Sequence, residues 1–226
     1  MALEQLVAGT SPVSLAGSRV LPVAAPLEPL LPDGLRRGSV VAVEGSTSLA
    51  LAVLAGPSAA GSWCAAVGLP SLGLVAAAEL GVALERLALV ASPGAAEGWA
   101  TVVAALVDAM DVVLVRPPAH LRPGDARRLA ARARERGAVL VAAGRWSERT
   151  DVRLRVTARV WEGLGLGHGR LRARRVDVVA EGRGAAARPR LLSLWLPGPG
   201  GELAAVDGGD RRPAREPASG PERAAG

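Results

Sequence analysis

One segment constrains the architecture of this chain more than any other: Val40-Val41-Ala42-Val43-Glu44-Gly45-Ser46-Thr47-Ser48. It opens with a short run of apolar, mostly β-branched residues in which no polar residue alternates, which is typical of a strand buried on both sides. A single glycine follows, and three hydroxyl residues then precede the uncharged segment Leu49–Ala52. Hydroxyl side chains are good helix N-caps, so a helix should begin here. A buried strand that turns at once into a buried helix predicts the first unit of a helix-covered parallel sheet.

Strands and helices continue to alternate up to residue 142. Short apolar runs of this kind, separated by helical segments, are typical of an α/β protein with a mostly parallel central sheet flanked by helices. We expect strands at 40–44, 62–67, 87–91, 112–115 and 138–142, and helices at 48–55, 72–80, 95–110 and 125–136.

The pattern changes after Gly144, where apolar and basic residues alternate one by one. Val152, Leu154, Val156 and Ala158 alternate with Arg153, Arg155, Thr157 and Arg159. Residues 170–179 and 191–196 look similar, and a glycine-rich turn at 163–169 separates the first two runs. This predicts an antiparallel extension on the C-terminal side of the sheet, with one apolar face and one arginine-rich face.

We expect three segments along the chain. Residues 1–34 form an N-terminal arm, with a short helix at 3–7 and an extended part that prolines at 22, 26, 29 and 32 enforce. Residues 35–196 form the core. Residues 197–226 are rich in Gly, Pro and mixed charge, so we expect a disordered tail.

The composition points to a cytoplasmic protein. Cys64 is the single cysteine among 226 residues, which excludes an internal disulfide and fits a reducing compartment. The first residues lack the basic region of a signal peptide. Residues 49–78 carry no charge, but glycines and prolines break them into short pieces, so we interpret them as buried core and expect no membrane partner.

The basic charge is uneven and consists of arginine alone. All 27 basic residues are Arg, and residues 116–190 hold 19 of them against 7 acids, whereas residues 1–115 hold 4 against 9 acids. In the helix at 125–136, Arg128, Arg132 and Arg136 recur every four residues and should form one exposed stripe, opposite Leu129, Ala130 and Ala133. Such a basic half favours a polyanion or an acidic protein as partner, although ordinary solvated faces would look the same.

The turn after the first strand lies where a nucleotide-binding P-loop would lie. A working P-loop has the pattern GxxxxGK[ST], whose lysine reaches the β- and γ-phosphates. This chain has no lysine, and the span Gly45, Ser46, Thr47, Ser48 is too short for the pattern. A GC-rich genome explains arginine in place of surface lysine, but it rarely removes a lysine that chemistry requires. We interpret these four residues as the remnant of a P-loop that holds no cofactor.

The position that should anchor Mg²⁺ is also changed. The strand at 112–115 should end in an acidic residue, yet Arg116 follows it, and a cation there opposes metal binding. Asp111 stands at the opposite end of the same strand. His120 and His168 lie in Pro-rich and Gly-rich segments and Cys64 has no evident activator, so we expect no catalytic or metal site.

These features together resemble the RecA-type ATPase core. Residues 30–45, with the turn Leu31-Pro32-Asp33-Gly34 before the first strand, look like the RecA entry to its P-loop, and residues 111–115 match the Walker B strand in place. Gly68-Leu69-Pro70 stands where the catalytic Glu of RecA is expected. Within that superfamily, residues 18–196 are most similar to the ImuA-type SOS mutagenesis proteins, in particular the actinobacterial form ImuA′.

The resemblance implies a non-enzymatic adaptor in error-prone translesion DNA synthesis during the DNA damage response. Its implied partners are an ImuB-like inactive Y-family polymerase and a C-family error-prone polymerase, with RecA as a further candidate. Two alternatives stay open: a RecA-like repair protein that binds DNA directly, and an active NTPase whose turnover depends on Ser48 or Thr47. The residues that would contact DNA or a partner are Arg128, Arg132, Arg136, Arg153, Arg155, Arg170, Arg172 and Arg174.

Overall fold

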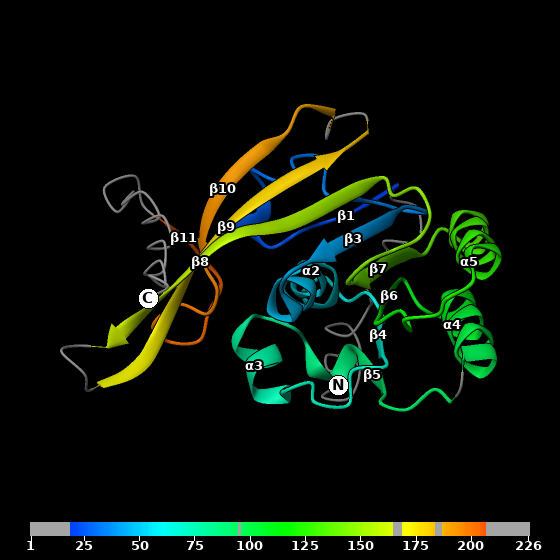
Figure 1. The fold of residues 1–226 in the computed structure, drawn as a ribbon, viewed down its shortest axis with the longest axis horizontal. Coiled ribbons are helices and arrows are strands. Elements are labelled where there is room, and N and C mark those ends of the chain that lie inside the picture. Colours follow the sequence, from blue (N-terminus) through cyan, green and yellow to red (C-terminus); the bar gives the residue numbers. More distant parts are fainter. Residues whose placement is uncertain (1–18, 95, 165–168, 184–186, 207–226) are drawn as a thin grey trace, which may run out of the picture.

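The computed structural model of this chain describes residues 19–94, 96–164, 169–183 and 187–206. Within these residues one sheet runs through the molecule, with the strand order β11-β10-β9-β8-β3-β7-β6-β4-β5 (Figure 1). The strands are β3 (Val40–Glu44), β4 (Cys64–Val67), β5 (Leu87–Val90), β6 (Val112–Val115), β7 (Val139–Ala143), β8 (Val152–Leu164), β9 (Gly169–Gly182), β10 (Arg190–Trp195) and β11 (Ala204–Ala205).

The sheet has the two parts that the sequence predicts. Strands β3 to β7 pair in parallel, and β8 also runs parallel to β3. From β8 onward the pairs β8–β9, β9–β10 and β10–β11 are antiparallel. The mostly parallel core and its antiparallel extension are therefore confirmed, and each predicted core strand lies within two residues of its observed bounds.

Helices cover both faces of the parallel part (Figure 1). On one face, α2 (Thr47–Ala59) is apolar all round and packs with α3 (Leu74–Glu79) against one cluster of core residues. On the other face, α4 (Ala96–Ala109) and α5 (Pro123–Arg136) cover a second cluster that includes Trp99 and Leu129. Leu129 and Ala133 of α5 are buried as predicted, and the opposite side of that helix carries the arginine stripe.

Helix α2 continues past its predicted end at Ala55, through Gly56 and Pro57. A side chain at Gly56 would place its Cβ 2.5 Å from the carbonyl carbon of Val23. The glycine therefore lets the N-terminal segment lie directly on the helix. Burial of this last turn offsets the hydrogen bond that the proline cannot make.

The described part of the N-terminal segment packs closely on the core. Strands β1 (Val20–Leu21) and β2 (Leu35–Arg36) pair with each other, and the 3-10 helix η2 (Ala25–Leu27) lies between them. Leu27 and Leu30 are fully buried. The continuously extended arm that we expected is wrong for this part, because these leucines turn inward between the prolines. The helix expected at 3–7 lies outside the described residues.

The alternation expected along β8 is wrong beyond Val156. A β-bulge interrupts the β8–β9 ladder, so Val156 lies opposite Val178 but Ala158 lies opposite Asp177. Thr157 is the extra residue, and its hydroxyl donates to the Asp177 carbonyl at 3.2 Å. A one-residue shift moves every later side chain to the other face. Arg159 therefore joins the apolar face of the sheet instead of the face of Arg153 and Arg155.

The C-terminal boundary lies later than expected. Ala204 and Ala205 pair with β10 as an edge strand, so the sheet extends past residue 197. Residues 207–226, where we expected most of the disordered tail, lie outside the described residues. Among the residues that the structure covers, no helix is long and apolar enough to cross a membrane.

Candidate functional site

The P-loop remnant is a tight turn followed by a capped helix. Gly45 has a φ of 85°, a left-handed conformation that favours glycine, and it directs the chain from β3 into α2. The Ser46 hydroxyl accepts a hydrogen bond from the Leu49 amide at 3.1 Å, which makes it the N-cap of α2. The Ser46 hydroxyl therefore stabilises the start of α2, which explains this residue without a bound nucleotide.

Arg116 contacts this turn from the end of β6. Its backbone amide donates to the Val67 carbonyl at the end of β4, which fixes the residue at the carboxyl edge of the sheet. From there its guanidinium Nη2 donates to Thr47 Oγ1 at 2.8 Å. In a working P-loop a hydroxyl at the start of this helix holds Mg²⁺. Here a fixed positive charge contacts that hydroxyl, and a second cation would meet Coulomb repulsion there.

A second arginine approaches the turn from the antiparallel extension. Arg159 Nη2 lies 3.7 Å from the position that a Cβ of Gly45 would take. It reaches this place because the bulge at Thr157 turns it toward α2. The remnant therefore has a guanidinium on each side, one from the end of β6 and one from β8.

Asp111 lies at the opposite edge of the sheet, as predicted. Its carboxylate accepts from the Trp63 amide at 2.9 Å and pairs with Arg37 at 2.9 Å. It joins the amino ends of β4 and β6 to the segment before β3. Asp111 is therefore a structural residue that lies far from the remnant and cannot replace the missing metal anchor.

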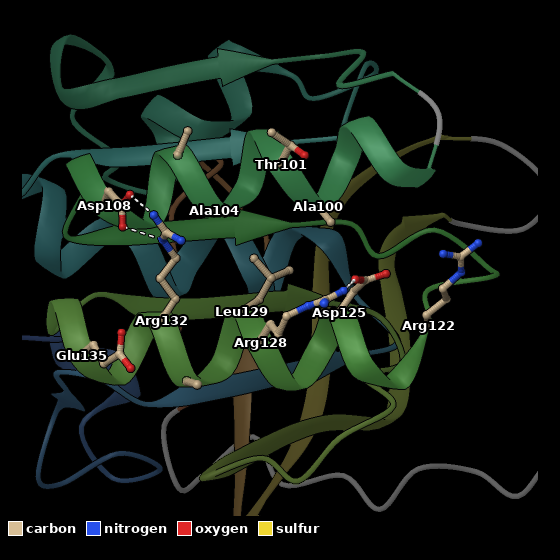
Figure 2. A pocket seen from close by; sticks show the side chains of 12 residues that line it. Ala100, Thr101, Ala104, Asp108, Arg122, Asp125, Arg128, Leu129, Arg132 and Glu135 are labelled. Carbon is tan, nitrogen blue, oxygen red and sulfur yellow. Dashed lines mark hydrogen bonds and ion pairs between the residues drawn. The ribbon is translucent and has the colours of Figure 1, made fainter.

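The arginine stripe on α5 lies along a groove of about 820 Å³ between α4 and α5 (Figure 2). Asp108 of α4 points at this stripe, and its carboxylate accepts from Arg132 at 2.7 and 2.5 Å and from Arg136 at 3.0 Å. Arg128 pairs with Asp125 on its own helix. The hydrogen bond from Arg132, together with the charges of Arg132 and Arg136, lowers the Asp108 pKa to about 2. Acidic neighbours thus neutralise much of the predicted stripe.

The arginines at the base of β8 also have acidic partners. Arg153 Nη1 lies 3.5 Å from Glu44 Oε1, and Arg155 Nη2 lies 3.1 Å from Glu181 Oε1. The structure therefore divides the predicted contact residues into two groups. Arg128, Arg132, Arg136, Arg153 and Arg155 have partners in ion pairs, whereas Arg170, Arg172 and Arg174 lie together on β9.

Arg159 and Trp161 of β8 join the second group, although they were not among the contact residues predicted from the sequence. The Arg174 guanidinium stacks over the Trp161 ring at 5.2 Å, and its Nε donates to the Leu196 carbonyl at 2.7 Å. Burial lowers the Arg174 pKa, and the charge of Arg159 lowers it further. The sequence did not reveal these two residues because uniform alternation along β8 would place Arg159 on the face of Arg153 and Arg155, and only the bulge at Thr157 moves it to the face of Arg174.

Among the residues that the structure describes, the remaining reactive side chains form no catalytic arrangement. Cys64 is fully buried, and burial together with the charge of Asp111 raises its thiol pKa to about 12. His120 is exposed in the loop after β6, and His168 lies outside the described residues. Within the described ranges no group of His, Cys, Asp and Glu could hold a metal ion.

Comparison with known proteins places the chain in a family. The model of the MT3502 N-terminal domain matches residues 29–148, more than half of the sequence. The chain belongs to this family. It is also 40% identical over 136 residues to the uncharacterized protein Rv3395c of Mycobacterium tuberculosis (strain ATCC 25618 / H37Rv), a match that covers 59% of this chain and 64% of that protein. The match thus spans slightly less than two thirds of the relative's length.

A solved structure shows the fold class of this family member. The crystal structure of the RadB recombinase superposes with a TM-score of 0.56, covering 81% of this chain and 97% of the RadB chain at 16% identity. The RecA-like fold that the sequence predicts is therefore confirmed. The narrower likeness to ImuA-type proteins stays a prediction.

Proposed function

We propose that this member of the MT3502 N-terminal domain family is a non-catalytic accessory protein of error-prone translesion DNA synthesis, and that it acts through protein contacts. One observation carries the proposal: the Arg116 guanidinium donates to Thr47 at the place where a P-loop protein binds metal and phosphate. A RecA-like fold that keeps this turn, while an arginine of the same chain binds its hydroxyl, is better suited to assembly than to nucleotide turnover.

The chemistry of nucleotide hydrolysis supports the same proposal. A P-loop enzyme stabilises the transferring phosphoryl group with a lysine and a magnesium ion held by hydroxyl and carboxylate oxygens. This chain has arginine alone among its basic residues, and Asp111 is engaged at the other edge of the sheet. Two guanidiniums beside Gly45 and Thr47 would attract phosphate but would repel the metal that the reaction needs.

The proposed partners follow from the likeness to ImuA-type proteins. They are an ImuB-like inactive Y-family polymerase, a C-family error-prone polymerase and RecA, in the cytoplasm of a cell with damaged DNA. The RecA-like fold supports this, because the segment around β1 and the strand β5, which ends the sheet within the described residues, offer surfaces on which another protein can pack.

Affinity purification from cells with damaged DNA tests the proposal. The full chain is tagged, the lysate is treated with nuclease, and the proteins that remain bound are identified. We expect an ImuB-like protein, an error-prone polymerase or RecA, and we expect equal recovery with the Thr47→Val variant, because assembly would not depend on nucleotide. Recovery of none of these proteins, or recovery only with an intact Thr47 and ATP, would overturn the proposal.

A further inference from the structure

The strands β8 and β9 continue beyond the rest of the sheet as a two-stranded arm (Figure 1). Strand β3 pairs with β8 only as far as Arg155, and β10 pairs with β9 only from Arg175 onward. We define the arm as residues 159–164 and 169–174. Its two strands pair with each other, with Trp161 opposite Arg174 and Leu164 opposite Gly169.

One face of the arm concentrates positive charge. Directly opposite residues in an antiparallel pair share a face, so Trp161 lies on the face of Arg174, and Arg159 lies on the face of Val176. Beyond Glu162 the ladder is irregular a second time, but Leu164 lies opposite Gly169, so Gly169 and Ala173 both share the face of Glu162. Arg170 and Arg172 alternate with these two residues on β9, which adds them to the Arg174 face. We call this set the Arg–Trp face; its members are Arg159, Trp161, Arg170, Arg172 and Arg174.

The acidic residue of the described arm lies on the other face. Glu162 is opposite Ala173, one position out of phase with the Arg–Trp face. Glu79 of α3 lines a hollow that Arg172 also lines, and the Glu202 carboxylate lies against two glycines of the same hollow, so two carboxylates lie near the end of this face. The other basic clusters differ, because Arg132 and Arg136 share Asp108, and Arg155 pairs with Glu181. The Arg–Trp face therefore keeps an excess of positive charge.

Exposure and charge repulsion indicate a ligand for this face. Arg159, Arg170 and Arg172 are exposed, and Trp161 keeps 43% of its surface in contact with solvent. Arg174 is half-buried, and the nearby charge of Arg159 disfavours its charged form. A polyanion would relieve that repulsion, and a large exposed indole in the middle of a basic face is typical of a platform for stacking bases.

We propose that the Arg–Trp face binds single-stranded nucleic acid, with the exposed residues Arg159, Arg170 and Arg172 on phosphates and Trp161 stacked on a base. A duplex would hide its base faces, and an acidic protein offers no row of bases on which the indole could stack. The face continues toward the P-loop remnant, since Arg159 lies by Gly45 and Arg172 shares a hollow with Ser48. The strand would thus run along the arm toward the N-terminus of α2.

The binding site is independent of the adaptor role proposed above. A chain that recovers a polymerase but binds no oligonucleotide would refute the site and leave the adaptor. A chain that binds an oligonucleotide through the arm but recovers none of the proposed proteins would refute the adaptor role and leave the binding site. The two proposals can therefore fail separately.

The test measures the fluorescence anisotropy of a labelled thymidine oligonucleotide of about 20 nucleotides with the full chain, between about 50 and 200 mM salt. The arm variant is Arg170→Gln with Arg172→Gln. The matched control, Arg128→Gln with Arg132→Gln, removes the same charge from the ion-paired stripe on α5. Thermal unfolding of each variant confirms that it is folded.

We expect the arm variant to bind at least about tenfold more weakly, with a salt slope reduced by about 1.4, since each phosphate contact on a single strand contributes about 0.7. The control should stay within about twofold of the unchanged chain. Trp161→Leu should weaken binding about five- to a hundredfold and leave the salt slope unchanged, because stacking releases no counterions.

Four results would overturn the proposal. The first is absence of saturable binding at low salt, and the second is equal weakening by the arm variant and its control. The third is a Trp161→Leu variant that binds as well as the unchanged chain. The fourth is tighter binding of a duplex, or equal competition by poly-glutamate at the same charge concentration, which would indicate double-stranded DNA or an acidic protein instead.

Discussion

Arg159 lies directly opposite Val176 in the β8–β9 ladder, on the face of the sheet that α2 covers. An extra residue in β8, Thr157, produces this relationship, because it opens the ladder between Val156 and Ala158. The bulge has two consequences for the molecule. It brings a guanidinium to the turn at Gly45, and it places Trp161 on the same face as Arg174.

Deletion of Thr157 should reverse that arrangement without changing the net charge. Regular alternation would then continue past Val156, and Arg159 and Trp161 would move to the opposite face of the arm. We expect affinity for the thymidine oligonucleotide to fall about tenfold in a protein that still unfolds cooperatively. An affinity and a salt slope equal to those of the unchanged chain would show that the bulge does not position the site.

Gly56→Val should destabilise the fold strongly. A Cβ at this position would lie 2.5 Å from the Val23 carbonyl carbon, so either α2 or the N-terminal segment must shift. We expect a loss of about 3 kcal/mol or more in the free energy of unfolding, measured with urea, because overpacking and lost burial of nearby leucines add together.

Gly124→Ala is the matched control for that substitution. Gly124 lies in α5 and has no atom within 4 Å of an added Cβ, so the change should stabilise the protein by about 0.5–1 kcal/mol. Equal effects of the two substitutions would contradict the close packing of α2 against the N-terminal segment.

Asp108 should titrate far below an ordinary aspartate. The Arg132 hydrogen bond is the main reason that its pKa falls to about 2. A lowered carboxyl pKa stabilises the fold above the unfolded value of about 3.9, and this contribution is lost as the pH falls toward the folded value. NMR titration of the carboxyl carbon should show the low midpoint. It should move back toward the ordinary range in Arg132→Gln, and an unchanged midpoint would refute the pairing.

Cys64 should be unreactive in the native protein. Burial is the main reason that its thiol pKa rises to about 12. With a thiol reagent at about pH 8 we expect one reactive group per chain in denaturant, and native labelling only at the rate of unfolding. The raised pKa also predicts that stability declines as the pH rises from about 9 toward 12, because the unfolded thiol ionises first. Rapid labelling of Cys64 under native conditions would contradict its burial in the core.

The parallel core could be predicted because its signals are local. Runs such as Val112–Val115 are apolar on both faces, which only a covered strand tolerates, and the repeat of Arg128, Arg132 and Arg136 fixes the exposed side of α5. Gly45 and Ser46 marked the turn and the cap for the same reason. Each of these features depends on neighbours within a few residues.

The site could be predicted only in part because its geometry depends on distant pairs. Nothing in residues 125–136 shows that Asp108 neutralises two of the arginines, and nothing in residues 112–118 shows that Arg116 reaches Thr47. The bulge at Thr157 carries no glycine or proline to mark it. The sequence therefore indicated the basic half correctly, but the structure decides which arginines form one face.

Phosphate release from ATP by the purified full chain, with Mg²⁺ and single-stranded DNA, shows whether the turn after β3 still serves a nucleotide. Thr47→Val is the matched control, because it removes the hydroxyl that Arg116 contacts. We expect the unchanged chain to release no more phosphate than the variant. Mg²⁺-dependent turnover that Thr47→Val abolishes would contradict this expectation, since the site would then be a working nucleotide site despite its arginine.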